Sequence, residues 1–224
     1  MKAYKLSGEA LAISRDILGD PLATEHCLLS LSAAASSLGR YAEARRLAEE
    51  GLQFSKALNH RSGIGDSLKW LGLISHKLGE TERAQALIRQ SVSQFSEIGD
   101  RTLIADALVD LGAVTRASGA ESEAKQYLLE ALRTAIETQT KHTALQALME
   151  IAVIKMSEGH TELALELVTH CLRQPSTRRE VTDHAEALHA KLVAQLTPQQ
   201  IEAAEARAHA KTLESLEQET LGAG

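Results

Sequence analysis

The sequence predicts an all-α solenoid, in which antiparallel helical hairpins stack on one another and a helical cap follows at the C-terminal end. Three observations predict this fold. Ala and Leu are abundant, and the 224 residues include only three prolines. Apolar residues recur at the spacing of one helix face. Four glycines interrupt these helical stretches at intervals of forty residues, at Gly39, Gly79, Gly119 and Gly159.

The forty-residue period also holds in columns of apolar residues on both sides of each glycine. Each block therefore reads as a helix, a turn and a second helix, because glycine adopts turn conformations that a β-carbon opposes. The repeated columns are Ala44, Ala84, Ala124 and Ala164; Leu31, Leu71, Leu111 and Ile151; Leu28, Leu68, Leu108 and Leu148; and Leu52, Val92, Leu132 and Leu172.

The columns resemble the tetratricopeptide repeat, whose pattern places Trp or Leu, Leu-Gly, a large residue, Ala, an aromatic residue and Ala. In this sequence the matching residues are Leu68, Leu71, Gly72, Ala84, Ile88 and Ser91, followed by Leu108, Leu111, Gly112, Ala124, Leu128 and Ala131. Two columns differ from the family pattern. Ser75 and Thr115 replace the large residue, and the aromatic column is aliphatic. The period of forty is typical of the long-repeat subclass, and the resemblance implies a right-handed α–α superhelix.

The period divides the chain into predicted segments. Four repeats are expected at 22–60, 61–100, 101–140 and 141–175, with capping helices in 176–224. Residues 1–20 read as the second helix of a truncated repeat, because Ile17-Leu18-Gly19-Asp20 matches Glu97-Ile98-Gly99-Asp100. We therefore expect more repeats upstream in a longer protein. The alternative is a natural start at Met1, with dimerisation covering the apolar residues Leu6, Leu11, Ile13 and Leu18.

The predicted cap contains three helices, at Val181 to Leu196, Gln199 to Ala210 and Leu213 to Leu221. Thr197 followed by Pro198 is typical of a helix start. The segment EARAHAKTLESLEQETL resembles the C-terminal end of large bacterial signalling ATPases and transcriptional regulators of the LuxR, AfsR and MalT-like type. That resemblance implies a ligand-sensing region, next to a nucleotide switch that this chain does not contain.

Composition excludes several other functions. A formal charge of −6 argues against direct binding of nucleic acid, and no apolar run is long enough to cross a membrane. Cys27 and Cys171 have no metal-like spacing, which favours a reducing, cytoplasmic compartment. Arg61-Ser62-Gly63-Ile64-Gly65-Asp66 is too sparse in glycine for a phosphate loop. No catalytic constellation is recognised, so we expect neither an enzyme nor a cofactor or metal.

Binding is expected on the concave surface, which the first helix of each repeat lines. Trp70 is the only tryptophan, and its column otherwise holds Ser30, Asp110 and Glu150. We therefore expect Trp70 to face the groove as a binding hot spot; the alternative is that a neighbouring side chain covers it. The candidate groove residues are His26, Asp66, Lys69, Trp70, His76, Lys77, Asp106, Asp110, Arg116 and Glu150.

The expected partner is a protein or peptide. Lys69, Lys77 and Arg116 could receive an acidic or C-terminal segment. The acidic residues on the same surface instead favour a peptide with charges of both signs, or salt bridges within the groove. A small molecule inside the superhelix and a homo-oligomer formed through the N-terminal helix are further hypotheses. A free-standing scaffold or adaptor for complex assembly is the alternative to the sensor of a regulator.

Overall fold

The computed structural model describes residues 2–174 and 179–222 and is all-helical over them, as predicted. The chain forms two compact units, Met1–Val114 and Thr115–Gly224, and each is treated by itself below. The helices of the first unit are α1 (Lys2–Ile13), the π-helical turn η1 (Ser14–Leu18), α2 (Pro21–Ser37), α3 (Tyr41–Ala57), α4 (Arg61–Lys77), α5 (Thr81–Ile98) and most of α6 (Arg101–Ala117). The helices of the second are α7 (Glu121–Glu137), α8 (Lys141–Ser157), α9 (Thr161–Leu172), α10 (Arg179–Val193), α11 (Pro198–Ala210) and α12 (Leu213–Gly222).

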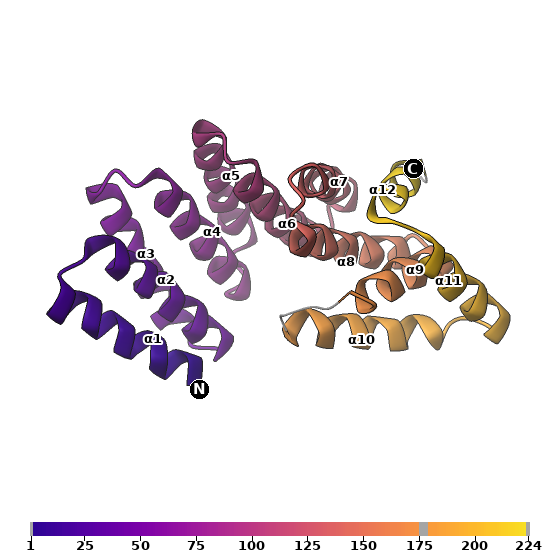
Figure 1. Cartoon of the computed structure of the whole chain (residues 1–224), viewed down its shortest axis with the longest axis horizontal. Coiled ribbons are helices and arrows are strands. Elements are labelled where there is room, and N and C mark those ends of the chain that lie inside the picture. Colours follow the sequence, from indigo (N-terminus) through magenta and orange to yellow (C-terminus); the bar gives the residue numbers. More distant parts are fainter. Residues whose placement is uncertain (1, 175–178, 223–224) are drawn as a thin grey trace. The chain divides into compact units, whose positions relative to one another are not determined.

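Successive helices pack on one another as antiparallel pairs within each unit (Figure 1). In the first unit α1 packs on α2, and the contacts continue in order through α3 and α4 to α5. In the second unit α8 packs on α7 and α9, while α10 and α11 both pack on α9. This order is that of a solenoid, in which each hairpin buries its apolar faces against its sequence neighbours.

The four periodic glycines are turn residues, as predicted. Gly39, Gly79, Gly119 and Gly159 all have positive φ, between 75° and 87°. In each turn the following backbone N–H reaches back to a carbonyl at the end of the helix, for example from Glu80 to Ser75 at 2.9 Å. This is the bonding of a left-handed helix end, which glycine adopts without the penalty of a β-carbon.

A second set of left-handed residues also follows the forty-residue period. Gly19 and Gly99 have positive φ at the turns between hairpins, and Asn59 and Gln139 take the same conformation at the two matching positions. A non-glycine residue there costs about 1–2 kcal/mol, less for Asn. The turns between hairpins are therefore as regular as those within them, although two of the four lack glycine.

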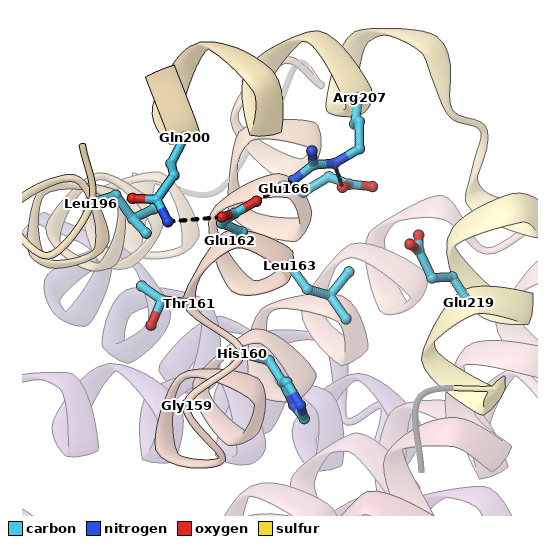
Figure 2. A pocket seen from close by; sticks show the side chains of 10 residues that line it. All are labelled: Gly159, His160, Thr161, Glu162, Leu163, Glu166, Leu196, Gln200, Arg207 and Glu219. Carbon is cyan, nitrogen blue, oxygen red and sulfur yellow. Dashed lines mark hydrogen bonds and ion pairs between the residues drawn. The ribbon is translucent and has the colours of Figure 1, made fainter. Parts of the chain in front are cut away.

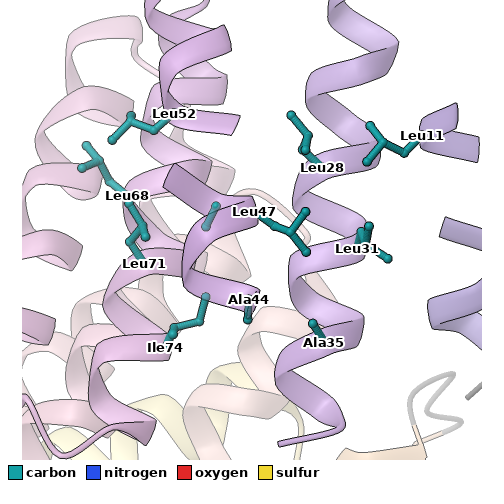
Figure 3. Packing of buried hydrophobic residues seen from close by; sticks show 11 residues of the cluster. Leu11, Leu28, Leu31, Ala35, Ala44, Leu47, Leu52, Leu68, Leu71 and Ile74 are labelled. Carbon is teal, nitrogen blue, oxygen red and sulfur yellow. The ribbon is translucent and has the colours of Figure 1, made fainter. Parts of the chain in front are cut away.

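The core of the first unit is built from the predicted apolar columns (Figure 3). Leu28, Leu31 and Ala35 of α2 meet Ala44 and Leu47 of α3 in one buried cluster. The cluster continues into α4 through Leu68, Leu71 and Ile74. Small alanines between larger leucines let the helix backbones approach closely, which fits a chain with 3% aromatic residues.

The start of the chain is only partly as expected. Leu6, Ile13 and Leu18 are exposed, with 47–65% of their surface accessible, as predicted for residues without an apolar neighbour. Leu11 differs, because α1 turns this side chain into the cluster formed with α2, where it is 7% exposed. The predicted exposure of Leu11 was therefore wrong.

The C-terminal helices begin where the sequence predicted, within two residues. Thr197 caps α11 and forms a capping box with Gln200, and Pro198 occupies the first turn. Leu188 and Leu216 are buried. The predicted repeat end at residue 175 lies outside the described residues, as does the side chain of Leu221. Within the described ranges, no helix has the length and apolar content that crossing a bilayer requires.

Candidate functional site

Three predicted groove residues of the first unit, Asp66, Asp106 and Asp110, lie around one buried ammonium group. Lys69 of α4 is 8% exposed and forms an ion pair with Asp106 of α6. Burial alone would lower the pKa of Lys69, but the nearby carboxylates of Asp110, Asp106 and Asp66 outweigh it and raise that pKa. We call Lys69, Asp66, Asp106 and Asp110 the acidic cluster, because three carboxylates surround one cation.

Asp66 is the member of the acidic cluster whose ionisation is opposed by burial. Burial raises the pKa of its carboxyl, Lys69 opposes that rise, and Asp106 reinforces it. His26, on α2, is exposed and adds a smaller opposing effect. Ionisation of Asp66 therefore opposes folding.

We expect replacement of Asp66 by asparagine to stabilise the protein at neutral pH. A raised pKa means that the folded chain holds the Asp66 proton more tightly than the unfolded chain, so ionisation opposes folding. The gain in melting temperature should be present at pH 7 and shrink as the pH falls towards the ordinary aspartate value of 3.8. Asp106→Asn is the matched control, because it removes the partner of Lys69 and should destabilise. A loss of stability in Asp66→Asn at pH 7 would contradict this reasoning.

Trp70 follows Lys69 on α4 and lies one helical turn beyond Asp66, on the same face. Its side chain is partly exposed and packs partly against the apolar cluster of the first unit. Part of the indole is therefore held in place, and part remains accessible, one helical turn from Asp66. Of the other candidates on α4, His76 is half-buried and Lys77 is exposed.

The two candidates of the second unit pair with each other. The Arg116 guanidinium lies 2.9 Å from Glu150 Oε2, and both side chains are mostly buried. Lys69 and Arg116 are both neutralised by carboxylates one repeat further along the chain. These ion pairs weaken the hypothesis that the two cations receive an acidic peptide.

Comparisons with known proteins were made by family model, by curated sequence and by structure. Tetratricopeptide-repeat models match residues 24–59 and 64–137. These two segments are tetratricopeptide repeats. The crystal structure of BtubC (BKLC) from P. vanneervenii is similar in fold, with a TM-score of 0.69 at 14% identity over 96% of this chain and 90% of that one. The search of curated proteins gives no match.

Burial shows which of the forty-residue columns are packing positions. Ala48, Ile88, Leu128 and Val168, in the column that the family fills with an aromatic residue, are all fully buried. The column of Ser75 and Thr115 continues in Lys155, which is also fully buried and lies 2.7 Å from Glu158. The sequence did not predict burial of Lys155, because only its place in the column marks this lysine as a packing residue.

In the second unit, a set of ion pairs joins the last repeat helix to the cap. Glu166 of α9 is 1% exposed and is 2.9 Å from Arg207 and 2.5 Å from Lys211. Glu162 accepts hydrogen bonds from Arg207 at 3.1 Å and from Gln200 at 2.9 Å (Figure 2). The pairs lie beside a cavity of about 520 Å³ between α9, α11 and α12. These ion pairs explain how a cap that is rich in charged residues packs on a repeat helix.

A second cavity of the same unit has a volume of about 440 Å³ and a mixed lining. Ile136 and Leu213 supply apolar surface, and Lys141 and Gln139 supply polar groups. His170, at the wall, is 4% exposed, and burial lowers its pKa, so the imidazole is neutral at pH 7. This cavity is the place in the second unit to which the small-molecule hypothesis applies. Among the described residues, no His, Cys, Asp and Glu cluster could hold a metal ion.

Proposed function

We propose that this chain is a protein-binding module whose first unit recognises a cationic, lysine- or arginine-containing segment of its partner. Tetratricopeptide repeats are generally protein-binding modules, which gives the class of function. The acidic cluster favours a positively charged partner segment, because its single cation, Lys69, is already enclosed by Asp66, Asp106 and Asp110. The excess of carboxylates would attract a positive side chain and repel an acidic segment.

Trp70 supplies the second element of the proposed site. An indole face beside carboxylates is suited to a lysine or arginine, whose cation contacts the ring while its charge is balanced. Partly exposed tryptophans on a fixed backbone also dominate many interfaces, because they bury a large area at little conformational cost. The observation that carries the proposal is the position of Trp70 on α4, one helical turn from Asp66 of the acidic cluster.

A peptide array tests the proposal. We expect wild-type protein to bind peptides with clustered Lys or Arg, and Trp70→Ala to lose at least about tenfold in affinity, the effect of one hot-spot residue. Phe54→Ala is the matched control. Phe54 is likewise half-buried against the same apolar cluster, but it lies on α3, the second helix of its hairpin. Equal binding by wild type and Trp70→Ala, or selection of acidic peptides, would overturn the proposal.

We further propose that the module is the sensing region of a larger ATP-dependent regulator. The support is the resemblance of residues 205–221 to the end of such regulators. In this chain the same segment provides Arg207 and Lys211, which pair with Glu166 of α9, and Glu219, which pairs with Lys211. A P-loop ATPase encoded upstream in the same reading frame would support this proposal. An upstream frame without one would favour the scaffold or adaptor.

A further inference from the structure

A chain of hydrogen bonds joins Ser62, His60 and Glu25 where α4 begins. His60 Nδ1 is 2.8 Å from Glu25 Oε2, and the Ser62 hydroxyl is 2.8 Å from His60 Nε2. Glu25 is 1% exposed, whereas the His60 side chain is 31% exposed and Ser62 is half-buried. The order of groups runs from a buried carboxylate to an imidazole to the hydroxyl of a half-buried serine.

His60 differs from the residues at two of the three matching positions, Asp20 and Asp100, whereas Thr140 at the third also makes no side-chain cap. In the matching position before α2 and α6, Asp20 and Asp100 cap the helix by accepting hydrogen bonds from backbone N–H groups. His60 makes no such cap, and its ring bridges Glu25 and Ser62 instead. The first N–H groups of α4 are therefore not covered by the side chain that precedes them.

Glu25 and Gly63 depart from the pattern together. A β-carbon on Gly63 would lie 1.7 Å from Glu25 Oε1 and 2.6 Å from His60 Nδ1, so only glycine leaves room for this pair. The buried carboxylate stands in a column that is otherwise non-ionisable, which continues as Gly65, Ala105 and Leu145. Because Glu25 and Gly63 are both unlike their columns and both serve the contact with His60, the arrangement is specific to this hairpin junction.

The geometry points to Ser62 as an activated nucleophile that accepts acyl groups from small activated esters. The Glu25 carboxylate accepts a hydrogen bond from His60 Nδ1–H, which leaves the lone pair of Nε2 directed at the Ser62 hydroxyl. This is the division of roles in serine hydrolases that use a Ser-His-Asp or Ser-His-Glu triad. The first N–H groups of α4, which His60 does not cap, lie next to Ser62 and can donate to the oxyanion.

Besides the ester, the reaction requires only water. Ser62 Oγ bonds to the ester carbonyl carbon while its proton passes to His60 Nε2, and Glu25 stabilises the resulting imidazolium. The carbon–oxygen bond to the alcohol then breaks, and His60 returns the proton to the leaving alkoxide. Water, deprotonated in the same way by His60, releases the carboxylic acid and restores the serine.

Labelling with a fluorophosphonate probe, followed by peptide mapping, tests this inference on the full chain. We expect the probe on Ser62, no label in Ser62→Ala, and labelling about a hundredfold slower in His60→Gln, the contribution of a general base. Ser37→Ala is the matched control, because the Ser37 hydroxyl donates to the backbone carbonyl of Ala33 at 3.0 Å rather than to an imidazole. It should label like wild type.

Hydrolysis of p-nitrophenyl acetate gives a second readout, and circular dichroism shows whether each variant is folded. Folded Ser62→Ala should lose the turnover that wild type shows. Absence of label in wild type, or label spread over several serines and unchanged in His60→Gln, would overturn the assignment. Neither outcome bears on peptide binding at the acidic cluster, so the two proposals fail separately.

Discussion

Replacing Phe95 by alanine is expected to lower the free energy of unfolding by about 3–5 kcal/mol. Phe95 is one of two phenylalanines and is fully buried. Its ring fills the space that Gly65 of α4 leaves open, since a β-carbon on Gly65 would lie 2.4 Å from the ring. The loss follows from the removed apolar area and the cavity left between α4 and α5, and urea unfolding measures it.

The same pair allows a sharper test by a double-mutant cycle. Gly65→Ala alone should destabilise by about 1–3 kcal/mol, because the new methyl collides with Phe95. In the Phe95→Ala background the collision is gone, and alanine should then stabilise the helix by up to about 1 kcal/mol. Gly8→Ala is the control, because nothing lies within 4 Å of a β-carbon there. Strictly additive effects would show that Gly65 and Phe95 are not complementary.

Replacing Lys69 by methionine is expected to lower the free energy of unfolding by about 2–3 kcal/mol. This loss is smaller than that of a fully buried ion pair, because the Asp106 side chain is a third exposed. The variant leaves Asp66, Asp106 and Asp110 close together without their shared cation. The deficit should shrink at acidic pH, where the carboxylates are protonated in folded and unfolded chains alike.

The double variant Lys69→Met/Asp106→Asn separates charge repulsion from lost packing. It removes one of the stranded carboxylates and should recover part of the lost stability. The measurement is the melting temperature of wild type, single and double variants between pH 4 and pH 8. A deficit that does not change with pH, or a double variant less stable than Lys69→Met, would show that the acidic cluster does not work as described.

Much of the fold could be predicted because a forty-residue period repeats the same physical requirement several times. A glycine such as Gly119 is ambiguous alone, but it becomes a turn when three others share its spacing. Asn59 and Gln139 escaped prediction for the opposite reason. They share the left-handed conformation of Gly19 and Gly99 but not the residue type that identifies it.

The helices that carry the candidate site residues could be predicted from the sequence, but the pairing of their charged side chains could not. Column register placed Lys69, Trp70 and Asp106 on first helices, and the structure brings Lys69 and Asp106 together. Register alone could not show that Lys69 is already paired, since pairing depends on side-chain direction between neighbouring repeats. The contacts among Glu25, His60 and Ser62 were missed similarly, because Glu25 and His60 are thirty-five residues apart.

The most direct test of the proposed function uses Trp70 as its own reporter, because the chain has no other tryptophan. A lysine- and arginine-rich peptide and an acidic peptide of equal length are titrated against the protein while the indole emission is recorded. We predict a saturable change with the cationic peptide alone, and an affinity that falls as salt is added. An equal or stronger response to the acidic peptide, or no response to the cationic one, would contradict recognition of a cationic segment beside the acidic cluster.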